Sequence, residues 1–138
     1  MDLEVRKHCS QMTTDEKLFL NSFLTKDKND YKMSRHATER EKQKIISKDC
    51  MYRAIHNGNI IEYHFKNSNR LLVRGNVDEN GYNVCVVVNC DTREIITAYM
   101  NSVSDNHCTL KEELYEKDFD IASMFKNNTY KNNNTKLN

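Results

Sequence analysis

The fold is decided by residues 59–101, which read NIIEYHFK-NSN-RLLVRGNV-DENG-YNVCVVVNC-DTR-EIITAYMN. Four runs rich in β-branched and aromatic residues alternate with short segments of turn-forming residues. The runs cover residues 59–66, 70–77, 82–90 and 94–101. Because each linker is only three or four residues long, successive strands should pair antiparallel. This stretch therefore predicts a four-stranded antiparallel meander.

Side-chain alternation gives the predicted sheet two different faces. One face is apolar and should pack on helices; it consists of Ile61, Tyr63, Phe65, Leu71, Val73, Val84, Val86, Val88, Ile96, Ala98 and Met100. The other face is mixed; it consists of Ile60, Glu62, His64, Arg70, Leu72, Arg74, Cys85, Val87, Ile95, Thr97, Tyr99 and Asn101. A half-polar sheet face with this chemistry is typical of a binding surface, unless the C-terminal segment covers it.

Three helices are predicted before the strands. Thr13 is a suitable N-cap for a helix that reaches about residue 26, and a second helix should cover residues 33–44. Ser47 caps the third, which ends at the glycine of Asn57-Gly58. Together with a short helix over residues 109–115, these elements predict an α+β fold. Its N-terminal helices pack on one face of the four-stranded antiparallel meander.

The chain divides into four parts by composition. Residues 1–32 form an N-terminal helical extension, and residues 33–104 form the α+β core. Residues 105–125 are an acidic C-terminal segment, and the asparagine- and lysine-rich residues 126–138 have the composition of a disordered tail. From residue 34 to 75, nine basic residues stand against four acidic ones, whereas residues 76–125 carry three basic and ten acidic residues. This asymmetry indicates a polyanion-binding face or a solvated surface whose charges happen to segregate.

Bulk composition excludes several classes of protein. Of the 138 residues, 38% are hydrophobic and 30% are charged, so one domain with a modest core is expected. No apolar run is long enough to span a membrane and the N-terminus lacks a signal-peptide pattern, so a cytoplasmic location is predicted. The five cysteines show no CxxC spacing, and buried reduced thiols are favoured over a metal site. No cofactor is expected.

The second predicted helix and the last predicted strand carry residues suited to RNA cleavage. At 100° per residue, His36 and Arg40 fall on the stripe of the helix that also holds Ala37, so both should face the protein. His36 could serve as acid or base and Arg40 could hold a phosphate, with Thr97 or Tyr99 adding a hydroxyl. Structural explanations stand beside each role: a packed histidine, an arginine paired with an acid, an ordinary strand aromatic.

Further phosphate contacts are predicted from the strands. Arg70, Arg74 and His64 lie on the mixed face, where their side chains could bind the substrate. The chain has no glycine-rich phosphate loop, because its Asn57-Gly58 and Asn80-Gly81 pairs are turn devices.

Residues 35–101 resemble a widespread family of small bacterial and phage domains of unknown function. The shared features are His36 and Arg40, Ile46-Ser47, Ala54-Ile55 with Gly58 and Ile60-Ile-Glu-Tyr63, Arg70-Leu-Leu-Val73, and Ile95-Ile-Thr-Ala-Tyr99. That family is in turn similar to the barnase–EndoU–colicin–RelE (BECR) ribonuclease superfamily. Its members pack N-terminal helices on a four-stranded antiparallel sheet.

The resemblance implies a metal-independent endoribonuclease of toxin type that acts on RNA at the 2′-OH. It places the site at His36, Arg40 and the last-strand hydroxyl residues, and it implies a cognate immunity or antitoxin protein as partner. The alternative is a non-catalytic regulator, encoded by a phage or mobile element, that binds a protein or nucleic acid on the same scaffold.

Overall fold

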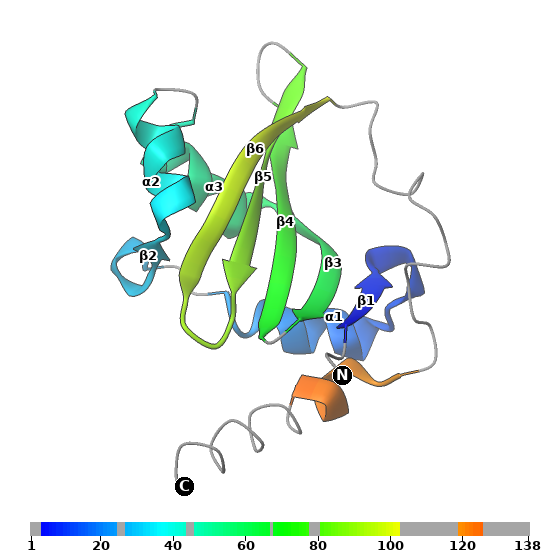
Figure 1. Ribbon diagram of the computed structural model, residues 1–138. Coiled ribbons are helices and arrows are strands. Elements are labelled where there is room, and N and C mark those ends of the chain that lie inside the picture. The colour runs from blue at the N-terminus through cyan, green and yellow to red at the C-terminus, as the bar shows by residue number, and fades with distance from the viewer. Residues whose placement is uncertain are drawn as a thin grey trace, which may run out of the picture.

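The protein has an α+β fold built on one six-stranded sheet with the order β1-β3-β4-β5-β6-β2 (Figure 1). The computed structural model describes residues 4–24, 27–43, 46–66, 68–77, 81–102 and 119–125. The strands are β1 (Glu4–His8), β2 (Lys32–Met33), β3 (Asn59–Lys66), β4 (Asn69–Val77), β5 (Tyr82–Asn89) and β6 (Glu94–Ser102). The helices are α1 (Thr14–Asn21), α2 (Arg35–Lys42) and α3 (Lys48–Asn57), with 3₁₀ turns η1 (Cys9–Gln11) and η2 (Lys28–Asp30).

The sheet is larger than the predicted meander of four strands. The antiparallel neighbours β3 to β6 match the predicted runs, but β1 adds an antiparallel strand beside β3. At the opposite edge, the two-residue strand β2 pairs in parallel with β6. The N-terminal segment, which was predicted to be a helical extension, therefore also contributes strands to the sheet. Both added strands are short and carry charged residues, so neither shows the β-type composition that marks a strand in sequence.

The helices also differ from their predicted extents. Helix α1 ends at Asn21, well before residue 26, and Ser34 is the N-cap of α2, so Lys32 and Met33 belong to a strand. The helix predicted at residues 109–115 lies outside the described residues. Residues 121–125 are helical.

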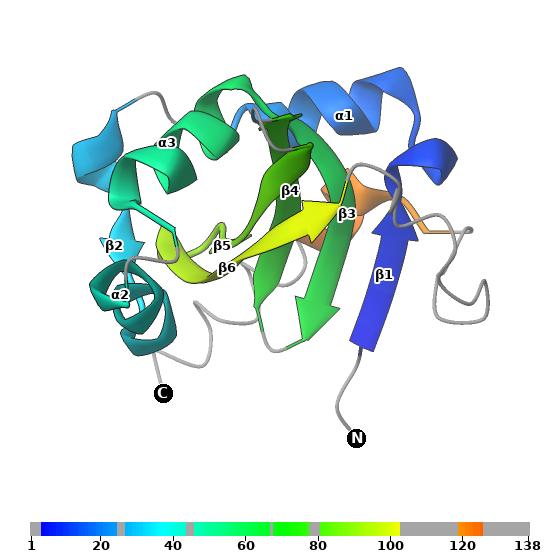
Figure 2. The same cartoon turned by 90° about the horizontal axis from the view of Figure 1, so that it is seen from above.

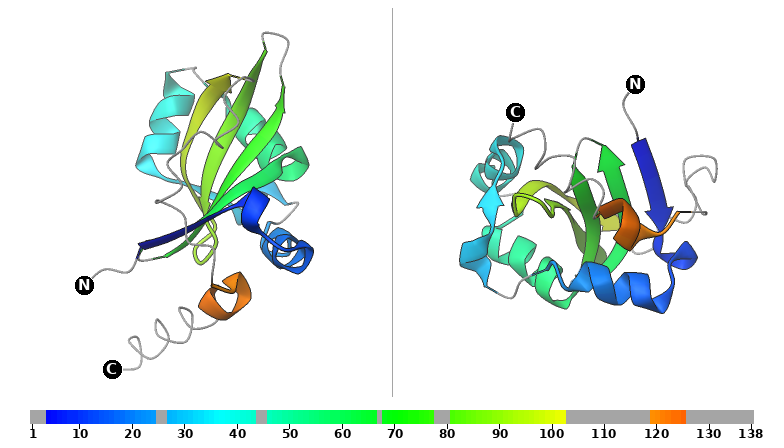
Figure 3. Two further views of the ribbon diagram at one scale, coloured as in Figure 1. Left: turned by 90° about the vertical axis from the view of Figure 1, so that its right-hand side faces the viewer. Right: turned by 90° about the horizontal axis from the view of Figure 1, so that it is seen from below.

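Not all helices lie on one side of the sheet. Figures 2 and 3 show α3 and α1 together on one side, whereas α2 lies beside the β6 edge and toward the other side. The sequence predicted a single helical layer because periodicity identifies a helix but not the side of the sheet to which its connection leads.

Two β-bulges reverse the predicted facing of three isoleucines. Pairing shifts between Ile60 and Glu62 on β3, and the pairing of β5 with β6 skips Ile96. As a result, Ile60 and Ile95 pack on the helical side, while Ile61 packs with Leu72 and Cys85 on the other side. An extra residue in a strand turns the following side chains to the other face, and simple alternation cannot foresee where it is inserted.

The hydrophobic core lies on the side of α1 and α3 and has two halves, one of which extends around the β6 edge to α2. One half joins α2 and α3 to β5 and β6 through Ala37, Met51, Ile55, Val86 and Ile95. The other half joins the N- and C-terminal segments to β3 and β4 through Val5, Leu20, Tyr63, Leu71 and Phe125. The residues outside 33–100 therefore complete the core of the same domain.

A buried ion pair links the terminal segments. The Lys7 ammonium on β1 contacts both carboxylate oxygens of Glu16 on α1, at 3.0 and 2.9 Å, and donates to the Phe119 carbonyl at 2.9 Å. Glu16 in turn accepts from the backbone N–H groups of Thr13 (2.9 Å) and Ile121 (3.0 Å). Both charged side chains are almost fully buried, and their hydrogen bonds satisfy the charges that burial would otherwise penalise.

We expect Glu16→Gln to lower the free energy of unfolding by about 3 kcal/mol, because it leaves the buried Lys7 ammonium without its counter-ion. Burial raises the pKa of Glu16, but the Thr13 and Ile121 N–H groups and Lys7 together lower it below its ordinary value of 4.5. This contribution is therefore complete above pH 4.5 and is lost as the pH falls through the lowered pKa. Urea titrations from pH 7 to pH 3 measure it. Asp15→Asn, which replaces an exposed acid in the same helical turn, is the control. If the free energy of unfolding depended on pH equally in both variants, the role of Glu16 would be contradicted.

We expect Gly58→Ala to destabilise the protein by about 3 kcal/mol. An added Cβ would overlap the backbone carbonyl oxygens of Ala54 and Arg74, neither of which can move without disturbing α3 or β4. Gly75→Ala is the matched control, since its Cβ would meet the Ala54 Cβ at 3.0 Å and requires a smaller shift. Thermal denaturation of both variants checks the ranking, and Gly58→Ala should be the less stable.

Candidate functional site

The sheet face opposite α1 and α3, called the mixed face from here on, gathers five of the seven sequence-predicted site residues. It carries Glu62, His64, Arg70, Leu72, Arg74, Cys85, Val87, Thr97 and Tyr99. His64 pairs with Arg70 across β3 and β4, and Thr97 pairs with Val87 across β6 and β5. Arg74 and Tyr99 flank Cys85 from the two neighbouring strands. Neighbouring strands are about 4.8 Å apart, so these side chains share one surface.

The centre of the mixed face is apolar. Ile61, Leu72 and Cys85 are buried there, and Val87 and Tyr99 pack against them half-buried. Tyr99 therefore acts at least as a packing aromatic, which was the structural alternative to its predicted role. The polar side chains of the mixed face surround this cluster.

Three neighbouring strands place basic side chains in one row across the mixed face. Arg6 on β1 pairs with His64 on β3, which pairs with Arg70 on β4. Arg70 is held by a hydrogen bond from its Nε to the Ser68 hydroxyl at 3.2 Å. His64 therefore lies between two guanidinium-bearing residues, an arrangement suited to binding a phosphate.

Sequence reasoning missed Arg6, His8 and Glu62 as site residues. Glu62 lies opposite His8 and next to Leu72, and its Oε1 is 3.9 Å from Nη1 of Arg6. The Glu62 side chain is 9% exposed and that of Arg6 is 30% exposed, so the pair is partly shielded from water. The His8 ring accepts the Ser10 N–H at Nδ1 (3.1 Å), which commits that nitrogen to capping η1. The only signal for β1 was the alternation of Val5 and Lys7 with Arg6 and His8.

Helix α2 borders the mixed face and carries His36 and Arg40. Its N-cap, Ser34, accepts the Ala37 N–H at 3.1 Å and donates through its hydroxyl to the Ile96 carbonyl at 2.5 Å. The Ser34 N–H also donates to the Ile95 carbonyl at 2.9 Å. The start of α2 is thus tied to the bulge of β6.

The prediction that His36 and Arg40 both face inward is only half right. Ala37 is fully buried and Arg40 is half-buried, with its Nε enclosed and without a hydrogen-bond partner among the described residues. His36 is exposed, and no described residue forms a hydrogen bond or ion pair with it. A helix that packs at a sheet edge buries a narrower stripe than one that lies across a sheet, and His36 falls outside that stripe.

Part of the segment expected to cover the mixed face lies elsewhere. Phe119 and Phe125 contact the Tyr63 ring, with centroids 6.1 and 6.4 Å away, and Phe125 stacks on Phe23 at 4.3 Å. Residues 119–125 therefore pack near α1, on the other side of the sheet. Residues 105–118 lie outside the described residues.

Four cysteines lie among the described residues. Cys9, Cys50, Cys85 and Cys90 are free thiols, and burial raises the pKa of Cys90 to about 12, so it stays protonated. In the part of the chain that the structure describes, no three histidine, cysteine or acidic side chains cluster as metal ligands. Nor is any helix of that part long and apolar enough to cross a membrane.

Residues 33–100 match the model of a family described as Domain of unknown function (DUF4258). The matched residues run from within β2 to within β6 and include α2 and α3. No curated protein and no solved structure gives a significant match. These comparisons carry no link to the BECR ribonucleases, which remains a prediction from the sequence.

We expect Ser34→Ala to cost about 2 kcal/mol of stability, because it removes both the cap of α2 and the hydrogen bond to the Ile96 carbonyl. Ser47→Ala is the matched control. The Ser47 hydroxyl caps α3 by accepting the Cys50 N–H at 3.1 Å, and its loss should cost about 1 kcal/mol. Chemical denaturation of the two variants measures the difference. Equal losses would show that the contact to β6 adds nothing.

Proposed function

We propose that the protein is a metal-independent endoribonuclease of toxin type that binds RNA across the mixed face. The observation that supports this best is the row of Arg6, His64 and Arg70, with Arg74 on the same face. Phosphate contacts from Arg and Lys side chains supply most of the affinity for a nucleic-acid backbone.

The mixed face also offers contacts for bases. The Tyr99 ring and Val87 border the arginines and remain half-exposed, so a base can stack or pack beside them. Thr97 adds a half-exposed hydroxyl on the neighbouring pair of strands. A chain of nucleotides can therefore contact charged and apolar groups in turn.

Cleavage at the 2′-OH needs a base, an acid and positive charge near the phosphorus. The arginines of the mixed face supply the charge, and the protein offers histidine as an acid or base on both β3 and α2. His36 and Arg40 remain candidates, since α2 borders this face (Figure 3). An immunity or antitoxin protein that covers the mixed face would restrain such an enzyme.

A second candidate function is a non-catalytic regulator that binds a protein through the mixed face. The apolar centre of Ile61, Leu72, Cys85, Val87 and Tyr99, bordered by arginines, favours it, because protein interfaces combine an apolar core with a polar rim. In that case no RNA is cut, and substitution of any histidine leaves the biological effect unchanged.

The purified protein should cut tRNA, mRNA or rRNA in the presence of EDTA and leave 2′,3′-cyclic phosphate and 5′-hydroxyl ends. Replacing Arg70 and Arg74 by alanine should weaken RNA binding and reduce the salt dependence of the affinity by about one unit of slope per arginine. Arg53→Ala, an exposed arginine on α3, is the control. If all three RNA classes stay intact, the regulator is the better proposal.

A further inference from the structure

Strand β3 presents two ionisable side chains side by side on the mixed face, Glu62 and His64. They are two residues apart on one strand, beyond the bulge at Ile61, so both point the same way. A rise of about 3.3 Å per residue puts their backbone positions about 6.6 Å apart.

Glu62 has the surroundings of a general base. Glu62 is paired with His8 on β1 and with Leu72 on β4, and only 9% of its side chain is exposed. Arg6, with Nη1 3.9 Å from Oε1, places a positive charge beside this carboxylate. Packing and this ion pair both hold the carboxylate in place, which proton transfer requires.

His64 has the surroundings of a general acid next to a phosphate. Arg6 and Arg70 are its direct cross-strand partners, so an arginine leaves the sheet on each side of His64. An anionic phosphate held by the two arginines would lie against the histidine ring. His36 has no such framework, since no described residue orients it.

Resting on the proposed ribonuclease function, we infer that Glu62 and His64 are its proton-transfer pair, with Arg6 and Arg70 on the scissile phosphate. Glu62 takes the proton of the 2′-OH, and the 2′ oxygen attacks phosphorus. As the bond from phosphorus to the 5′ oxygen breaks, the His64 imidazolium gives its proton to that oxygen. The products are a 2′,3′-cyclic phosphate and a 5′-hydroxyl, and the two protein groups then exchange one proton through water to start again.

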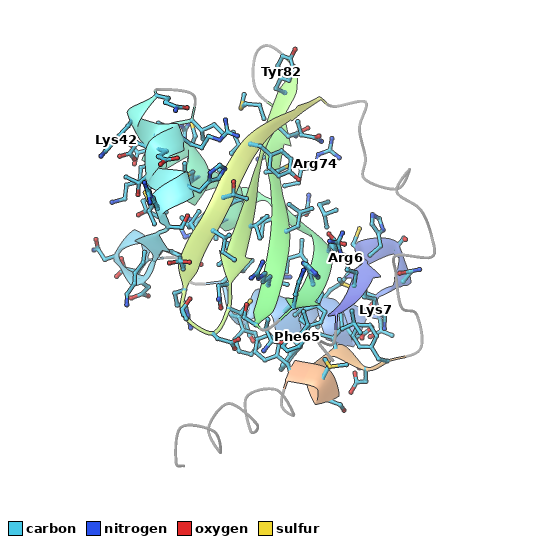
Figure 4. The ribbon with its side chains drawn as sticks, viewed as in Figure 1. Arg6, Lys7, Lys42, Phe65, Arg74 and Tyr82 are labelled. Atoms are coloured by element: carbon cyan, nitrogen blue, oxygen red, sulfur yellow. The ribbon has the colours of Figure 1, made fainter. Side chains whose placement is uncertain are left out.

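This assignment makes β1 part of the site. Arg6 lies outside residues 33–100, so the matched domain alone would lack one of the two arginines beside His64. The N-terminal strand, whose Arg6 and Lys7 are labelled in Figure 4, would therefore serve catalysis as well as packing.

The test compares two RNA substrates under single-turnover conditions in EDTA. One is natural, and in the other sulfur replaces the bridging 5′ oxygen at a single linkage. A thiolate leaves without a proton because thiol pKa values lie near 8.5, so the sulfur substrate needs no general acid. We expect His64→Gln to cut natural RNA 100-fold or more slower but the sulfur substrate at nearly the wild-type rate. Glu62→Gln should cleave both substrates slowly, because the sulfur leaving group does not replace the missing base.

The controls separate folding and binding from chemistry. Glu62→Asp keeps a carboxylate and should retain more activity than Glu62→Gln, and Glu94→Gln removes a carboxylate from the far end of the basic row and should act like wild type. RNA affinity and thermal stability of each variant show whether it still folds and binds.

The two failures differ. If the wild type cuts neither substrate, the ribonuclease function itself is wrong and the pair falls with it. If the wild type cuts RNA and Glu62→Gln cuts it equally fast, the function stands but the assignment of Glu62 is wrong. If His36→Ala, and not His64→Gln, is slow on natural RNA and fast on the sulfur substrate, the assignment of His64 is wrong.

Discussion

The buried ion pair between Lys7 and Glu16 fixes the position of β1, and much of the site depends on that strand. Successive side chains of a strand point to opposite faces, so burying Lys7 beside α1 turns Arg6 and His8 to the mixed face. There they lie opposite His64 and Glu62. A shift of one residue in this pairing would bury Arg6 and expose Lys7, which the cost of an unpaired buried charge opposes.

The same ion pair joins the segments that precede and follow the matched domain. Lys7 and Glu16 hold backbone groups of Phe119 and Ile121, while Leu20 and Phe125 contribute to the core half beneath β3 and β4. The family match covers most of the other half of the core, with α2 and α3. In this chain the terminal segments are therefore structural parts of one domain. The N-terminal one also supplies Arg6, which lies beside His64 in the basic row.

The two bulges, at Ile61 and Ile96, determine which side chains of the central strands reach the mixed face and where α2 attaches. The bulge on β3 sends Ile61 to the mixed face, where it fills the apolar cluster with Leu72 and Cys85. The bulge on β6 exposes the Ile96 carbonyl to the Ser34 hydroxyl, which sets where α2 begins. Helix α2 is thus anchored beside the mixed face at the irregular residue of the last strand.

The sequence alone determined the four central strands, the α+β class and the mixed face with His64, Arg70, Arg74, Thr97 and Tyr99. These follow from local properties: β-branched runs, turn residues and side-chain alternation. Only the tertiary structure decided that β1 joins the sheet, that His36 is exposed and that Ile60 and Ile95 point to the core. These depend on a buried ion pair between residues nine positions apart in the chain, on packing at a sheet edge and on inserted residues, none of which has a local sequence signal.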